Sequence, residues 1–203
     1  MSNFVSLSKE NNSMTVKLSK EKPAGRYGKI DVNLNWSQKK KGFLGMFSKP
    51  VDLDLGCLFE LKDGTKKTGC IQALGNAFGS FDSAPYISLD GDDRTGENQD
   101  GEWMRINGDQ WSQIKRIVIY AFIYDGVPSW NETDGVVKFF VNGETIEVKM
   151  DNSKVDKRLC AVALLENVGD EIKVQRLVEY YNDQEKLDRA YSWGMRWSSG
   201  TKD

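Results

Sequence analysis

The chain has 203 residues, of which 39% are hydrophobic and 29% are charged, and its formal net charge is −2. These values are typical of one soluble globular domain whose core is large enough to be stable without disulfides. The slightly acidic balance argues against nucleic acid as a partner. The sequence contains no histidine, which excludes catalytic triads with an imidazole base and removes the usual ligand of transition metals.

Apolar and polar residues alternate with a period of two, which predicts β-strands along most of the chain. The expected strands cover residues 30–36, 51–59, 114–124, 136–141, 145–150, 159–165 and 172–181. The unbroken apolar run 117–124 predicts a central strand buried on both faces. Asn142-Gly143 predicts a tight hairpin turn. Only residues 183–191 have helical spacing, and Asp183 is their expected N-cap.

Many short strands separated by turns indicate an all-β fold, either a sandwich or a barrel. We expect one domain over residues 1–203, with a helical and irregular C-terminal tail at 183–203. No run is long enough to cross a membrane, and the first residues lack the apolar core of a leader. Together with three cysteines, Cys57, Cys70 and Cys160, which we expect to be reduced and buried, this predicts a cytoplasmic protein.

Residues 38–50 combine three consecutive lysines with four large apolar side chains. The residues that would make a contact are Lys39, Lys40, Lys41, Phe43, Leu44 and Phe47. If exposed, this segment could press its apolar tip into an anionic membrane or a groove of a partner. If buried, it would cover an open end of the fold, which is favoured because most apolar side chains end up in a core.

Two acidic clusters are the main candidates for a functional site. Asp52 and Asp54 alternate with apolar residues on a predicted strand, so they share one face about 6.5–7 Å apart. Residues 90–102 hold six carboxylates and one arginine, a local charge of about −5, together with three glycines. The ligand chemistry is oxygen only, and Ca²⁺, which takes six to eight oxygens at about 2.3–2.6 Å, fits it best.

Three other interpretations remain open for these residues. Most acidic runs are solvated surface loops, and paired carboxylates also occur in glycoside hydrolases. A calcium-dependent carbohydrate-binding sandwich would use tryptophans to stack on sugar rings, although tryptophans more often fill a core. The candidate tryptophans are Trp36, Trp103, Trp111, Trp130, Trp193 and Trp197.

Segments 51–55 and 89–97 resemble the two signature segments of the TerD family of bacterial tellurium-resistance and stress-response proteins. Residues 123–126 resemble the third segment of that family. The sequences at 174–181 and 188–194 are more similar to its TerA branch. The resemblance covers roughly residues 4–182 and is specific only when the segments are taken together.

This resemblance implies a two-sheet antiparallel β-sandwich with a short C-terminal helix, which binds Ca²⁺ between strand and loop and catalyses no reaction. It also implies work with other tellurium-resistance proteins, including a membrane component, and hence a place in the cytoplasm or at the inner face of the membrane. Carried over by position, the expected metal ligands are Asp52, Asp54, Asp92, Asp93, Gly96, Asp100 and Glu102.

The match weakens after residue 97. The family pattern continues with a denser acidic run, whereas residues 98–102 carry fewer acids. A second ion site is therefore expected to be weak or absent. Asp125, at the end of the third segment, is expected to be a structural acceptor. The functional prediction is a non-enzymatic module in which Ca²⁺ orders the acidic segment and so creates a surface for a partner.

Overall fold

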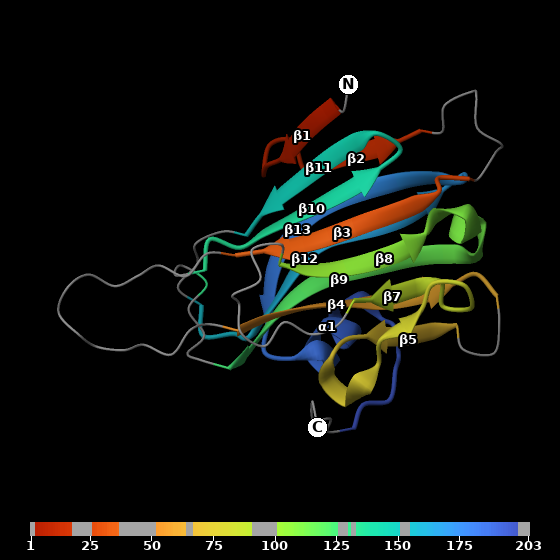
Figure 1. Cartoon of the computed structure of the whole chain (residues 1–203). Helices are drawn as coiled ribbons and strands as arrows, with labels where there is room; N and C mark the ends of the chain where they lie inside the picture. Colours follow the sequence, from red (N-terminus) through yellow and green to blue (C-terminus); the bar gives the residue numbers. More distant parts are fainter. Residues whose placement is uncertain are drawn as a thin grey trace.

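The computed structural model describes residues 3–17, 26–36, 52–63, 67–90, 101–125, 130, 133–150 and 155–198. These residues form two β-sheets that pack face to face, with one α-helix near the C-terminus (Figure 1). The expected all-β sandwich with a short C-terminal helix is confirmed.

Sheet A has the strand order β1-β11-β10-β3-β8-β7-β6. Its strands are β1 (Asn3–Leu7), β3 (Lys29–Asn35), β6 (Gly79–Ser80), β7 (Ile87–Leu89), β8 (Glu102–Asn107), β10 (Val136–Val141) and β11 (Glu144–Lys149). The predicted hairpin joins β10 to β11, and φ is 51° at Asn142 and 81° at Gly143, as a type I′ turn requires. Most pairs are antiparallel as predicted, but β1 pairs with β11 in parallel.

Sheet B has the strand order β2-β13-β12-β9-β4-β5. Its strands are β2 (Ser13–Val16), β4 (Asp52–Leu61), β5 (Thr68–Ile71), β9 (Ile114–Asp125), β12 (Leu159–Val168) and β13 (Glu171–Tyr181). Two short 3-10 helices, η1 (Leu74–Asn76) and η2 (Gly108–Gln113), lie in the connections. Within the described chain every neighbouring pair in sheet B is antiparallel.

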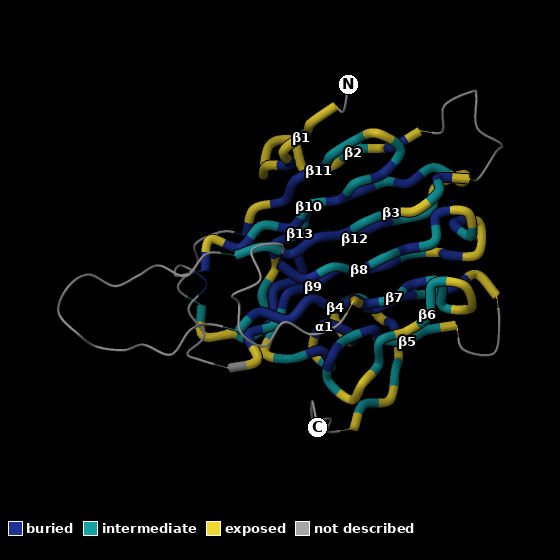
Figure 2. The backbone as a smooth tube through the Cα atoms, in the orientation of Figure 1, coloured by how far each residue is buried: buried dark blue, intermediate teal, exposed yellow. Residues whose placement is uncertain are grey.

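The central strands of sheet B, β4, β9 and β12, are buried on both faces, which explains their unbroken apolar runs. On β9, Ile117 and Ile119 point into the core between the sheets, whereas Val118 and Tyr120 point outward into a second buried cluster. Figure 2 shows the buried backbone concentrated in these central strands. The prediction of a central strand covered on both sides is confirmed for β9.

The helix and the residues after it cover the outer face of sheet B. The helix α1 (Gln184–Tyr191) begins where predicted, and the Asp183 carboxylate accepts a hydrogen bond from the Lys186 N–H at 2.8 Å. Leu187 and Trp193 join the outer cluster. No helix among the described residues is long and apolar enough to cross a bilayer.

Asp188, which is 2% exposed, fixes the segment that follows α1. Its carboxylate accepts hydrogen bonds from the N–H groups of Gly194 at 2.8 Å and Met195 at 3.1 Å, and from the Trp197 indole at 2.7 Å. Because the charge is buried and satisfied by three donors, its removal would leave all three without their acceptor. Residues 194–197 therefore form a defined segment along sheet B, which we call the C-terminal segment.

None of the three cysteines forms a disulfide, as expected. Cys57 and Cys160 are buried, but Cys70 is only half-buried, so the prediction of three buried thiols was wrong at one position. Cys70 lies on β5, the edge strand of sheet B, where neighbours cover one side of the strand only. Desolvation of the sulfur still raises the pKa of Cys70 to about 12, so the thiol remains protonated at neutral pH.

Gly56 on β4 allows the Tyr120 ring to lie directly over the strand. A Cβ at residue 56 would stand 2.4 Å from Cζ of that ring. We expect Gly56→Ala to lower the free energy of unfolding by about 1–3 kcal/mol through overpacking, measured by denaturant titration. In a Tyr120→Leu background the added methyl has room, so the loss should shrink; an equal loss in both backgrounds would contradict this account.

Candidate metal centre

Three of the predicted ligands fall in the described chain. Asp52 and Asp54 lie at the start of β4, and Glu102 is the first residue of β8. The other four, Asp92, Asp93, Gly96 and Asp100, lie outside the described residues, as does the lysine-rich segment 38–50.

Glu102 joins the two sheets at this end of the sandwich. The strand β5 ends at Ile71, opposite Cys57, and leaves the earlier part of β4 without that neighbour. The hydrogen-bonding direction alternates along a strand, so the Leu55 N–H points to the same side of β4 as the Cys57 N–H. On that side β5 does not extend to Leu55, so the N–H has no described strand to pair with. The Glu102 carboxylate, on a residue that is 3% exposed, accepts a hydrogen bond from this N–H at 2.5 Å.

Asp54 lies next to this contact and is 4% exposed. Leu53 and Leu55 belong to the core between the sheets, as the alternation predicted. Asp52 is half-buried, and its backbone pairs with that of Asp125 on β9. Asp54 is therefore buried on the stretch of β4 that the Glu102 carboxylate contacts. Both side chains are oxygen donors of the kind that a hard cation takes as ligands.

Asp90 has a different role from the acids that follow it. Arg105 donates to one Asp90 oxygen from Nε at 3.2 Å and from a terminal nitrogen at 2.8 Å, and to Asp31 at 2.6 Å. The hydrogen bond with Asp90 raises the pKa of the Arg105 guanidinium further above its ordinary value. Asp90 is thus neutralised by an arginine on β8 and acts as an anchor. Sequence reasoning missed Arg105 because only the register of β8 brings it there.

Backbone geometry fixes both ends of the connection between β7 and β8. The Asp90 N–H donates to the Trp103 carbonyl at 2.8 Å. Gly101 has φ of 67°, and a Cβ there would lie 2.2 Å from the Leu34 carbonyl oxygen. Gly101, one of the three glycines of the acidic segment, thus adopts a backbone conformation that other residues rarely adopt.

Within the described ranges, no group of three or more Asp, Glu, Cys or His side chains is arranged to hold a metal ion. Those ranges contain three of the seven predicted ligands, so they hold only part of the set. All three are oxygen donors, which suits Ca²⁺ and not a transition metal. Calcium binding at these residues stays a prediction.

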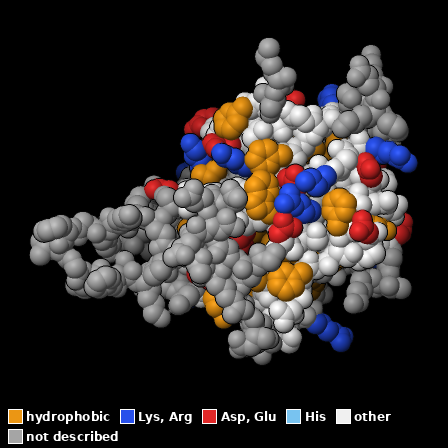
Figure 3. Space-filling view, in the orientation of Figure 1, with side chains coloured by type: hydrophobic (Ala, Val, Ile, Leu, Met, Phe, Trp, Pro, Cys, Tyr) orange, Lys and Arg blue, Asp and Glu red, His pale blue; other side chains and the backbone are white. Residues whose placement is uncertain are grey.

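Three of the six tryptophans fill the interior, and the other three are half-buried. Trp111, Trp130 and Trp193 are at most 6% exposed and cannot stack on a sugar. Trp103 packs against Phe140 with ring centroids 5.9 Å apart, and Arg105 lies 5.0 Å from the Trp103 ring. In the space-filling view, hydrophobic side chains and charges of both signs are interspersed on the surface (Figure 3). The core role anticipated for tryptophan is confirmed at three positions.

Comparison with known proteins gives one close sequence relative and two structural ones. No protein-family model matches the chain. The chain is 49% identical to the tellurium resistance protein TerA of an Alcaligenes species over 210 aligned positions, which cover 98% of the chain. It spans about 60% of the length of that relative.

Two crystal structures share the fold. One is a homologue of the telluride resistance protein TerD from Streptomyces coelicolor A3(2), with a TM-score of 0.52 and 17% identity, covering 80% of this chain and 95% of that one. The other is a protein of unknown function with a TM-score of 0.51 and 17% identity, covering 77% of this chain and 91% of that one. At such identities the likeness concerns the fold alone.

The Glu102 contact predicts a difference between two substitutions in metal-free protein. Glu102→Ala leaves the buried Leu55 N–H without its acceptor and should lower the free energy of unfolding by about 1–3 kcal/mol. Glu102→Gln keeps a carbonyl oxygen for that N–H and should lose less. Urea unfolding in excess EDTA measures both. Equal losses would show that the hydrogen bond contributes nothing beyond the charge.

Proposed function

The chain is a homologue of the tellurium resistance protein TerA, and we propose that it serves in that resistance as a calcium-binding, non-enzymatic interaction module. The observation that carries the calcium part is the burial of Asp54 and Glu102, each less than 5% exposed, against the same stretch of β4. The acids of segment 91–100 are the proposed further ligands, because β7 and β8 return both ends of that segment to this end of the sandwich.

Bound calcium would supply the positive charge that offsets repulsion among the clustered carboxylates. The residues of the chain do the rest. Glu102 ties β8 to β4 through Leu55, and Arg105 pairs with Asp90. With the local negative charge offset, this end of the sandwich can approach partner surfaces that it otherwise repels. The metal-bound state is therefore the proposed binding-competent one.

Calorimetric titration of EDTA-stripped protein measures calcium uptake, and thermal melts of the same protein with and without added metal measure its effect on Tm. At 100 times the Kd, a ligand adds about 2.7 kcal/mol to stability, which for a chain of this size raises Tm by roughly 5–10 °C. We expect this rise with Ca²⁺, a smaller one with Mg²⁺, and its loss in the Asp54→Asn/Glu102→Gln double variant.

Asp82→Asn is the matched control. Asp82 is exposed and lies in the β6–β7 connection, near the Asn107 end of β8, whereas Glu102 begins that strand. It removes a carboxylate charge far from the proposed ligands and should keep the full calcium response. Absence of calcium uptake at millimolar concentration in wild type would refute the proposal, and so would an equal loss in the control.

The proposed partners are other tellurium-resistance proteins and a membrane component, with the protein in the cytoplasm or at the inner face of the membrane. Segment 39–47 is the proposed contact because lysines beside large apolar side chains suit an anionic bilayer surface.

Flotation with vesicles containing phosphatidylglycerol tests this contact. Wild type should float, and Phe43→Ser/Phe47→Ser should reduce flotation several-fold because the apolar tip is lost. Phe4→Ser, at a phenylalanine 57% exposed on β1, is the control and should float like wild type. Equal flotation of all three proteins, or none by wild type, would exclude a role for the segment at membranes.

A further inference from the structure

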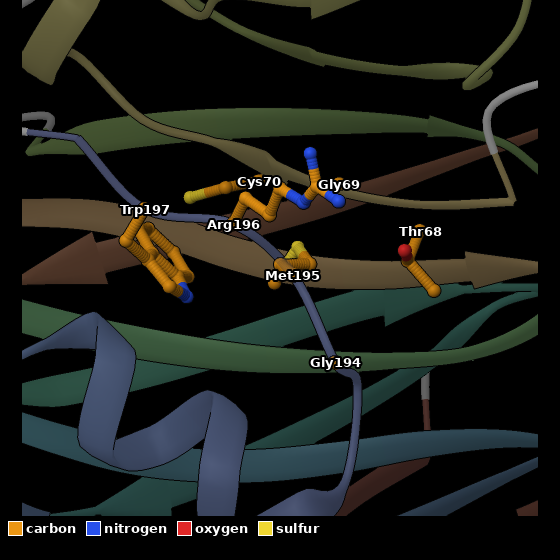
Figure 4. A pocket seen from close by; sticks show the side chains of 7 residues that line it. All are labelled: Thr68, Gly69, Cys70, Gly194, Met195, Arg196 and Trp197. Atoms are coloured by element: carbon orange, nitrogen blue, oxygen red, sulfur yellow. The ribbon is translucent and has the colours of Figure 1, made fainter.

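A cavity of about 380 Å³ lies between the edge strand of sheet B and the C-terminal segment. Thr68, Gly69 and Cys70 of β5 line one side, and residues 194–197 line the other (Figure 4). We propose that β5 and this cavity bind an extended, acidic peptide segment of a partner protein by strand addition. The proposal does not depend on calcium, because β5 contains none of the predicted metal ligands.

The register of β5 determines which of its backbone groups are available. The Leu61 N–H donates to the Lys67 carbonyl at 2.7 Å, so Lys67 faces β4. In an antiparallel pair the hydrogen-bonding direction alternates along the strand, so Gly69 and Ile71 also face β4. The N–H and C=O groups of Thr68 and Cys70 therefore point to the outer edge. No strand in the described chain pairs with that edge.

The other wall of the cavity is held in place by buried contacts. The Asp188 carboxylate holds the Gly194 and Met195 N–H groups and the Trp197 indole, as described above. On the strand side, Cys70 Sγ lies 3.3 Å from the Tyr120 hydroxyl, which donates to Gln72 at 2.6 Å. Both walls are thus defined before a ligand arrives, which lowers the entropic cost of binding.

The charge around the cavity favours an acidic ligand. Arg196 lines the cavity, and Lys67 immediately precedes β5; both are exposed, and neither takes part in an ion pair within the described residues. Because side chains alternate along a strand, Lys67 lies on the face of β5 opposite the one that Thr68 and Cys70 present. The nearby carboxylate of Glu60, which pairs with Thr68 across the strands, is occupied by Lys115 at 2.7 Å and Arg116 at 2.6 Å. The two exposed cations beside β5, one on each face, therefore make its surroundings locally positive although the whole chain carries −2.

These features together describe strand addition, in which backbone bonds supply affinity and side-chain contacts supply selectivity. The backbone of an extended peptide on β5 would form hydrogen bonds with the outward N–H and C=O groups of Thr68 and Cys70. One of its apolar side chains would enter the cavity against Met195 and Trp197, on the side where Arg196 lies. Its acidic side chains would point to the other face of the strand, toward Lys67, and the charge of Arg196 would add a longer-range attraction.

The probe is a capped hexapeptide of alternating Glu and Val, with a Lys-Val hexapeptide as the charge control. Amide NMR titration should shift the Thr68 and Cys70 signals and protect both amides from hydrogen exchange. We expect the Lys-Val peptide to bind at least 10-fold more weakly. Shifts that map elsewhere, or equal binding of both peptides, would overturn the proposal.

Thr68→Pro removes an outward N–H and blocks the edge while sparing the ladder with β4. It should weaken Glu-Val binding at least 10-fold, whereas Thr68→Val, which keeps the backbone donor, should bind within about twofold of wild type. Retained binding by Thr68→Pro would contradict strand addition.

If the proline variant does not fold, the charge-reversed Lys67→Glu/Arg196→Glu double variant decides. It should lose the Glu-Val peptide and gain the Lys-Val peptide, and unchanged selectivity would refute the charge argument. Sedimentation of wild type without peptide measures the oligomeric state and so tests whether a second copy of this chain occupies the β5 edge. A dimer that Thr68→Pro abolishes would mean that β5 pairs with a second copy of this chain, which would also overturn the proposal.

Discussion

The covering of sheet B on both faces is the constraint on which the rest of the structure depends. Sheet A covers the inner face, while α1 and the residues after it cover the outer face. Tyr120 can pack against β4 in the outer cluster only because residue 56 has no side chain. With both faces of its central strands occupied, sheet B offers its ends and its edge strands for recognition.

The end of the sandwich near β4 is where charge accumulates. Backbone groups of β4 beyond the reach of β5 need another partner, and Glu102 from sheet A supplies it at Leu55. That contact places a buried carboxylate beside the buried Asp54, while Arg105 binds the neighbouring Asp90. Arg105 thus pairs with Asp90, while Asp54 and Glu102 are removed from solvent. The proposed cation site uses these two buried oxygen donors.

The two proposed sites share β4 but use it differently. Glu102 accepts the Leu55 N–H of β4, and β5 pairs with β4 from Cys57 onward. In the described chain, the unpaired backbone groups on this side of the sheet are therefore those of β5. The first site would hold a cation through oxygen donors, and the second would hold a peptide through backbone groups and the two nearby cations. Because one needs negative side chains and the other needs Lys67 and Arg196, substitutions at one should leave the other intact.

The sequence by itself determined the local structure: strands from the alternation, the β10–β11 turn from Asn142-Gly143, and the start of α1 from Asp183. It also placed Leu53 and Leu55 in the core, because a period of two settles which face is apolar. Only the tertiary structure decided the parallel pairing of β1, the ion pair of Arg105 with Asp90, the anchoring by Asp188 and the partial exposure of Cys70. Each depends on which distant strands become neighbours and in what register, and no local pattern encodes that choice because it is set by packing the whole chain.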